Sequence, residues 1–121
     1  MDEEMSEEMD YRRLIASMQD TLRRKVKARN ITYTTEDDLR DEIFEAIQAV
    51  NERRRFEPTS SIPFEEKYSS LIVKLALSSI AKYGAEGEKS HSENGINRVY
   101  DNASEYPESL MSRIVPLAKA R

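Results

Sequence analysis

A chain of 121 residues fits one domain that can bury a modest hydrophobic core. Hydrophobic residues make up 38% and charged residues 35%, with no tryptophan, which favours a helical domain with a thin core. The absence of cysteine excludes disulfides and thiolate metal sites, and the most apolar run, 71–81, is interrupted by Lys74, Ser78 and Ser79, so no membrane-spanning segment is predicted.

The net charge of −4 hides a separation of charge within the first 30 residues. Residues 1–10 carry six acids and no base, whereas residues 11–30 carry seven bases and one acid, Asp20. Acids at a helix start and bases at its end each stabilise the helix by about 0.3–1 kcal/mol. We favour this interpretation over a basic stripe for nucleic acid, because no aromatic or glycine-rich element is interleaved with the bases. The acidic start is also unlike the basic start of a signal peptide, so we expect no secretion.

The apolar spacing predicts a first helix over about 7–28, with the residues 1–8 as an acidic N-terminal tail. Asn30 is expected to end this helix, because asparagine tolerates the left-handed conformation of a helix cap. A second helix is predicted from Thr35, which can form a capping box with Asp38, to about Arg55. The apolar faces of these helices carry Tyr11, Leu14, Ile15, Met18, Leu22 and Val26, then Leu39, Ile43, Ile47 and Val50.

A connector with two prolines, 56–68, precedes the third predicted helix. Pro63 suits the start of that helix, since its missing N–H would be unpaired there in any case. The helix is expected to run to about Tyr83 and to end at Gly84. It has the widest apolar face, so we expect it to be the core helix. That face carries Phe64, Tyr68, Leu71, Ile72, Leu75, Ala76 and Ile80.

The last predicted helix is short, because Pro107 starts it and Pro116 stops it, over about 107–115. Residues 116–121 remain as a C-terminal tail. The chain 1–121 is therefore predicted to be a single all-α domain. Its expected architecture is a small bundle of about four helices, with a projecting β-hairpin or long loop between the last two helices.

The segment 84–100 holds all three glycines and the only histidine, His91. Lys89 is followed by a serine, but the glycine spacing of a phosphate-binding loop is missing and an acid, Glu88, stands beside the lysine. A single histidine cannot form a structural zinc site. The two serines that flank His91 point away from it in an extended chain, so no catalytic set is present. We therefore predict no enzyme activity, no cofactor and no metal.

Asn94 and Gly95 lie in the middle of this segment and favour a tight hairpin, because both residues accept a positive φ. Side chains on one face of the second arm would then be Ile96, Arg98 and Tyr100. An isolated hairpin is only marginally stable in water, so it would need the surface of its own helices or of a neighbouring subunit. The alternative is a polar loop without regular structure.

Residues 82–116, KYGAEGEKSHSENGINRVYDNASEYPESLMSRIVP, resemble the C-terminal half of phage head–tail connector proteins. These are also described as DNA-packaging proteins of tailed phages and of prophages in Gram-positive bacteria. The matching features are a tyrosine that closes a helix, a Gly-x-Glu-Gly turn, Ser-x-Ser-Glu-Asn-Gly, a tyrosine on the following arm, and Tyr-Pro-Glu-Ser before the last helix. With the upstream core helix the resemblance covers 63–121, about half of the chain, and the N-terminal half lies outside it.

The resemblance implies a structural adaptor that forms a ring below the portal of a filled head, extends the DNA channel and offers a surface to tail or stopper proteins. It implies self-association, with a dodecameric ring in the virion and a monomer in solution, and passage of DNA without sequence specificity. It implies no membrane partner. The implied location is the head–tail interface of the virion, and the cytoplasm of the bacterial host during assembly.

The same resemblance suggests two contact regions. The subunit interface or channel loop would comprise Gly84, Glu86, Gly87, Lys89, His91, Glu93, Asn94, Gly95, Ile96, Arg98 and Tyr100. The portal-docking tail would comprise Pro116, Leu117, Lys119 and Arg121. The alternative function is a small DNA-binding regulatory or packaging-accessory protein that uses the basic first helix. A helix-turn-helix needs short helices joined by a tight turn, and the predicted helices are too long for it.

Overall fold

The computed structural model describes residues 2–86 and 106–118, with residues 2–9 and 83–86 described by their backbone alone. The described chain is all-α, as predicted, and no strand occurs within these two ranges. The predicted hairpin falls on residues outside them. The elements are α1 (Asp2–Ala28), α2 (Glu36–Arg54), the 3₁₀ turn η1 (Glu66–Tyr68), α3 (Ser69–Glu86) and α6 (Glu108–Met111).

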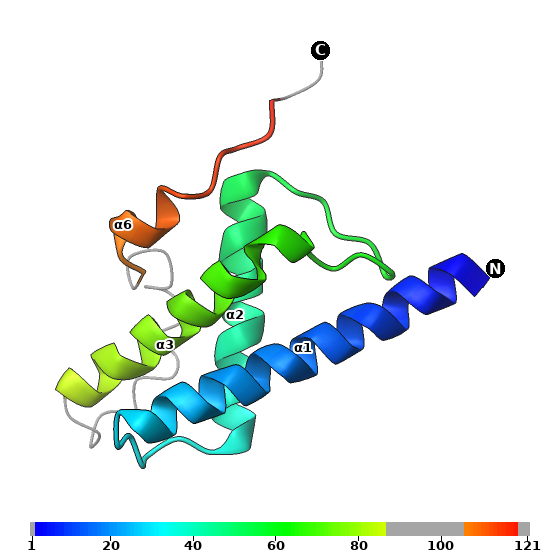
Figure 1. The fold of residues 1–121 in the computed structure, drawn as a ribbon. Helices are drawn as coiled ribbons and strands as arrows, with labels where there is room; N and C mark the ends of the chain where they lie inside the picture. The colour runs from blue at the N-terminus through cyan, green and yellow to red at the C-terminus, as the bar shows by residue number, and fades with distance from the viewer. Residues whose placement is uncertain (1, 87–105, 119–121) are drawn as a thin grey trace.

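The core is built around α3, which contacts α1, α2, η1 and α6 (Figure 1). In Figure 1, α1 and α3 lie side by side and α2 crosses both. Leu75 and Ile72 of α3 are fully buried, as are Leu22 of α1 and Ile43 of α2. The Tyr33 hydroxyl donates a hydrogen bond of 2.6 Å to the Ile80 carbonyl, which fixes the α1–α2 link against α3. The prediction of α3 as the core helix is confirmed.

Local signals set the facing ends of α1 and α2. Asn30 has a φ of 60°, and the amide of Ile31 donates to the Val26 carbonyl, so α1 ends in the left-handed cap that asparagine predicted. At the start of α2, the Asp38 amide donates to the Thr35 hydroxyl and the Thr35 amide donates to the Asp38 carboxylate. Both bonds of the predicted capping box are therefore present.

The far end of α2 is also a left-handed cap, but it uses Arg55, with φ 64° and ψ 37°. A residue with a Cβ pays about 1–2 kcal/mol for this conformation, which glycine adopts freely. We therefore expect Arg55→Gly to stabilise the domain by up to about 1 kcal/mol, less than the full cost because glycine also makes the unfolded chain more flexible. The measurement is the midpoint of urea unfolding. The matched control is Glu52→Gly, an exposed site inside α2, where glycine should lower the free energy of unfolding by about 1 kcal/mol. A midpoint for Arg55→Gly below that of the wild type would contradict the prediction.

Two predicted helix starts are wrong. The first helix begins at Asp2 rather than near 7, so the acidic segment expected as a tail is helical. The third helix begins at Ser69 rather than at Pro63. The reason lies in the core: Phe64 is fully buried against the Tyr11 ring, with centroids 5.1 Å apart, and Asn51 Nδ2 donates to the Pro63 carbonyl at 2.9 Å. These contacts hold the connector in a non-helical path.

Two predicted helix ends are also wrong. Gly84 does not end α3, which continues to Glu86; a glycine inside a helix costs about 1 kcal/mol but does not stop it. The last helix spans only Glu108–Met111 instead of about 107–115. Ile114 is 2% exposed, so the chain leaves the helical path to place this side chain in the core.

Candidate functional site

The residues predicted for a subunit contact fall mostly outside the described structure. Gly84 and Glu86 are placed by the backbone in the last turn of α3. Gly87, Lys89, His91, Glu93, Asn94, Gly95, Ile96, Arg98 and Tyr100 lie outside the described residues. Among the residues whose side chains the structure describes, 10–82 and 106–118, no group of three or more His, Asp or Glu side chains is arranged to hold a metal ion.

The predicted docking tail is described as far as Ala118, whereas Lys119 and Arg121 lie outside the structure. Residues 114–118 form an extended segment, which we call the C-terminal strap. It passes the end of α2 and leaves the body of the molecule (Figure 1). Its Val115 and Leu117 side chains are 64% and 37% exposed, and Pro116 stands between them. The strap therefore presents apolar side chains to the surroundings.

Arg54, at the end of α2, anchors the strap to the domain. Its Nη1 donates to the Val115 carbonyl at 2.6 Å, and its own carbonyl accepts a bond of 2.8 Å from the Leu117 amide. Its guanidinium also forms a two-pronged bond with Glu65, at 2.7 and 3.2 Å, and lies 5.7 Å from the centre of the Tyr68 ring. The hydrogen bonds to the Glu65 carboxylate raise the pKa of Arg54. This anchoring role of Arg54 was not predicted from the sequence.

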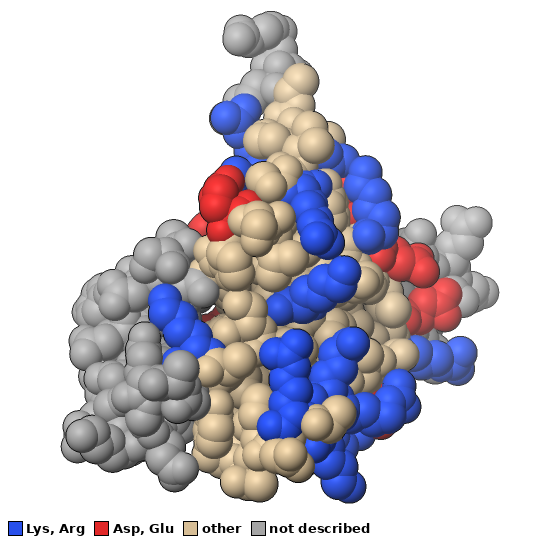
Figure 2. Space-filling view, turned by 60° about the vertical axis from the view of Figure 1, so that its left-hand side comes forward, with Lys and Arg blue, Asp and Glu red and all other residues tan. Residues whose placement is uncertain are grey.

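A second feature is a groove between α1 and α3, which we call the basic groove. It comprises two adjoining hollows of about 270 and 420 Å³, and Lys25 and Lys74 line both of them. Arg29 and Leu110 of α6 close the end near the C-termini of α1 and α3. Figure 2 brings these helix ends forward and shows Lys and Arg side chains gathered in the lower half of the face. No Asp or Glu is among the described residues that line the groove.

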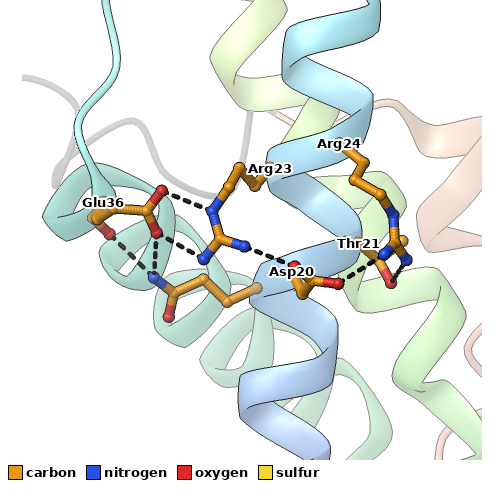
Figure 3. Close-up of polar contacts among 6 residues, drawn as sticks. Asp20, Thr21, Arg23, Arg24 and Glu36 are labelled. Atoms are coloured by element: carbon orange, nitrogen blue, oxygen red, sulfur yellow. Dashed lines mark hydrogen bonds and ion pairs between the residues drawn. The ribbon is translucent and has the colours of Figure 1, made fainter.

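Two other bases of α1, Arg23 and Arg24, are engaged within the molecule (Figure 3). Arg23 donates to both carboxylate oxygens of Glu36 at 2.6 and 2.8 Å, and Asp20 accepts from both Arg23 and Arg24 at 2.6 Å. The bonds from Arg23 and then from Gln19 lower the pKa of Glu36 to about 2. This network ties the end of α1 to the start of α2, so Arg23 and Arg24 have a structural role.

Lys25, Arg29 and Lys74 differ from these arginines. None of the three takes part in an ion pair among the described residues. All three are exposed. Part of the positive charge of α1 is therefore not neutralised by the ion pairs with Asp20 and Glu36, and the helix dipole does not account for it either. This charge and the charge of α3 meet only because the two helices pack side by side.

One more exposed side chain stands out. Phe44 of α2 is 47% exposed and, with Val115 and Leu117, completes the exposed large hydrophobic residues of the described structure. None of the described helices combines the length and the apolar character needed to cross a membrane. Comparisons with protein-family models, with curated proteins and with solved structures find no match to this chain.

Proposed function

We propose that this chain is a structural subunit of a phage head–tail connector, which forms a ring, docks on the portal, extends the DNA channel and joins head to tail after DNA packaging. The C-terminal strap is the observation that carries the proposal. Val115 and Leu117 are exposed on a segment whose direction is set by hydrogen bonds to Arg54, so a partner can bind both side chains. A segment ordered before it binds loses less conformational entropy on binding, which favours its use as a docking element.

The placement of the two proposed contact regions also supports this function. The strap leaves the domain beside the end of α2, whereas α3 ends beside the end of α1, on the other side of the molecule (Figure 1). The segment that follows α3 is the one whose Asn94-Gly95 pair favours a hairpin. We propose that residues 84–100 form a hairpin or long loop that contacts a neighbouring subunit or the channel. The strap would meanwhile bind the portal.

The strap can be tested without changing the rest of the fold. We expect deletion of 117–121, or the double change Val115→Ser and Leu117→Ser, to leave helicity and ring formation intact and to weaken attachment to the portal at least tenfold, since about 2 kcal/mol of apolar burial is lost. The measurement is co-sedimentation of the purified protein with the cognate portal ring. Ser109→Ala, an exposed change in α6, is the matched control. Unchanged attachment would remove the strap from the docking surface.

The loop provides the contrasting variant. Replacing Ile96, Arg98 and Tyr100 together by alanine should leave helicity and thermal unfolding nearly unchanged and abolish rings, because these residue types are enriched at interface cores. Negative-stain images of the protein with and without the portal would show at which step each variant fails. Rings formed on the portal by the loop variant would place the subunit contact on the helices instead.

The basic groove is the observation that favours the second candidate, a DNA-binding regulatory or packaging-accessory protein. The lengths of α1 and α2, 27 and 19 residues, disfavour a helix-turn-helix. Two of the bases of α1, Arg23 and Arg24, are also engaged by carboxylates. A connector that lets DNA pass should bind it weakly and without sequence preference. Nanomolar affinity for one duplex sequence at physiological salt would favour the second candidate instead.

A further inference from the structure

We infer that the basic groove binds the acidic N-terminal turns of α1 from a second copy of this chain, in a head-to-tail contact. The inference rests on the proposed function in one respect, since it supplies a subunit contact for the ring. It adds a contact surface to the described helices, separate from the segment 84–100.

The groove is suited to carboxylates. Lys25 lies in the last turns of α1, Arg29 directly follows the end of α1, and Lys74 lies in α3, so three cations face one hollow that no described carboxylate lines. Hydroxyl groups of Ser70 and Ser78 add neutral donors along its wall. Lysine and arginine can donate three and five hydrogen bonds respectively and accept none, so this lining favours an acceptor-rich, negatively charged occupant.

The N-terminal end of α1 has the complementary composition. Residues 1–10 carry six acids and no base, and α1 is helical from Asp2. The helix dipole accounts for acids in the first turn only, yet Glu7, Glu8 and Asp10 lie beyond it. Glu3 with Glu7, and Glu4 with Glu8, are like charges four residues apart, and each such pair costs a helix about 0.2–0.5 kcal/mol. A basic partner surface would relieve this repulsion.

The two charged regions cannot meet within one molecule. Asp10 and Lys25 are 15 positions apart on one continuous helix, which places them about 22 Å apart at about 1.5 Å per residue. The N-terminal end of α1 also stands clear of the other helices in Figure 1. Only a second molecule can therefore bring the acidic turns to the groove.

Such a contact joins different surfaces of the two copies, and each added copy leaves one acidic end and one groove open. Contacts of this type close into a ring or continue as a filament. Nucleic acid is the less favoured occupant, because the chain carries a net charge of −4 and the acidic turns belong to the same helix as the groove bases.

The test uses two charge-reversed variants of the full chain and their combination. The groove variant is Lys25→Glu with Lys74→Glu, two exposed sites. The end variant changes Glu3, Glu4, Glu7 and Glu8 to lysine, which takes the net charge of residues 1–10 from −6 to +2. In sedimentation velocity at low salt, we expect the wild type to self-associate and each variant to do so about a hundredfold more weakly, since like charges then oppose each other. High salt should weaken the wild-type contact. Circular dichroism would check that all variants remain folded.

Two further samples identify the contact as head-to-tail. A mixture of the two variants should associate in alternating order, because the native end of the groove variant fits the native groove of the end variant, and the reversed end of the end variant fits the reversed groove of the groove variant. The combined variant, with both regions reversed, should recover self-association. A mixture that does not associate, or a combined variant that stays monomeric, would overturn the inference.

The remaining outcomes separate this inference from the proposed function. If the charge variants assemble as well as the wild type, the inference is overturned. The connector proposal is then tested by the loop and strap variants alone. A wild type that is monomeric at low salt and high protein concentration would also overturn it, while ring formation on the portal would still test the connector. Weaker binding of a short DNA duplex by the groove variant alone, without any self-association of the wild type, would reassign the groove to nucleic acid.

Discussion

Replacing Leu75 by alanine is expected to lower the free energy of unfolding by about 2–5 kcal/mol. Leu75 is fully buried on α3, the helix that contacts both α1 and α2. The change removes apolar contacts and leaves a cavity that three packed helices cannot easily close. Since a small domain is stable by only about 5–15 kcal/mol, a large part of the stability would be lost.

Urea unfolding followed by circular dichroism measures this loss. The neighbouring Lys74 is exposed, so Lys74→Ala should change the free energy of unfolding by no more than about 0.5 kcal/mol. Phe64→Leu, at another fully buried site, provides an intermediate reference because it removes less volume than a change to alanine. A melting temperature of Leu75→Ala within a degree of the wild type would show that the buried face of α3 has been assigned incorrectly.

The second large effect is expected at Arg54. Arg54→Met keeps most of the aliphatic stem but removes the guanidinium, and we expect it to lower the free energy of unfolding. The two side chains of the Arg54–Glu65 pair are only 11% and 23% exposed, so the Glu65 carboxylate would remain partly buried without its cation. The Val115 carbonyl would lose its donor at the same time. We therefore expect faster proteolysis of the C-terminal strap in this variant.

A double-mutant cycle distinguishes the ion pair from simple packing. Arg54→Met combined with Glu65→Leu removes both charges, so it should recover a large part of the loss, because the cost lies mainly in the stranded carboxylate. Arg54→Lys keeps the charge but not the two-pronged geometry and should give an intermediate loss. Additive losses in the double variant would contradict this account of Arg54.

Several features were predictable because the interactions that create them are local. The Thr35–Asp38 capping box joins residues three apart, and the Asn30 cap depends on one backbone conformation. The all-α class and the core position of α3 follow from apolar residues repeated every three to four positions. A sequence pattern is sufficient in such cases, because the contacting groups lie within one or two turns of each other or share one helix face.

The starts and ends that were wrong depend on contacts between distant parts of the chain. The connector around Pro63 stays non-helical because Phe64 packs against Tyr11 and Asn51 binds the Pro63 carbonyl. The last helix is short because Ile114 enters the core. A helix-favouring residue cannot reveal by itself that a core contact will compete for the same stretch of chain.

The candidate functional surfaces were likewise decided by the tertiary structure. Composition revealed the bases of α1, but the crossing of α1 and α2 decided that Arg23 would be held by Glu36. The packing of α1 beside α3 decided that Lys25 and Lys74 would share a groove, although 49 positions separate them in the sequence. Charges are visible in a sequence, whereas the partners that neutralise them are set by how the helices cross, and the charges left over are the ones available for binding.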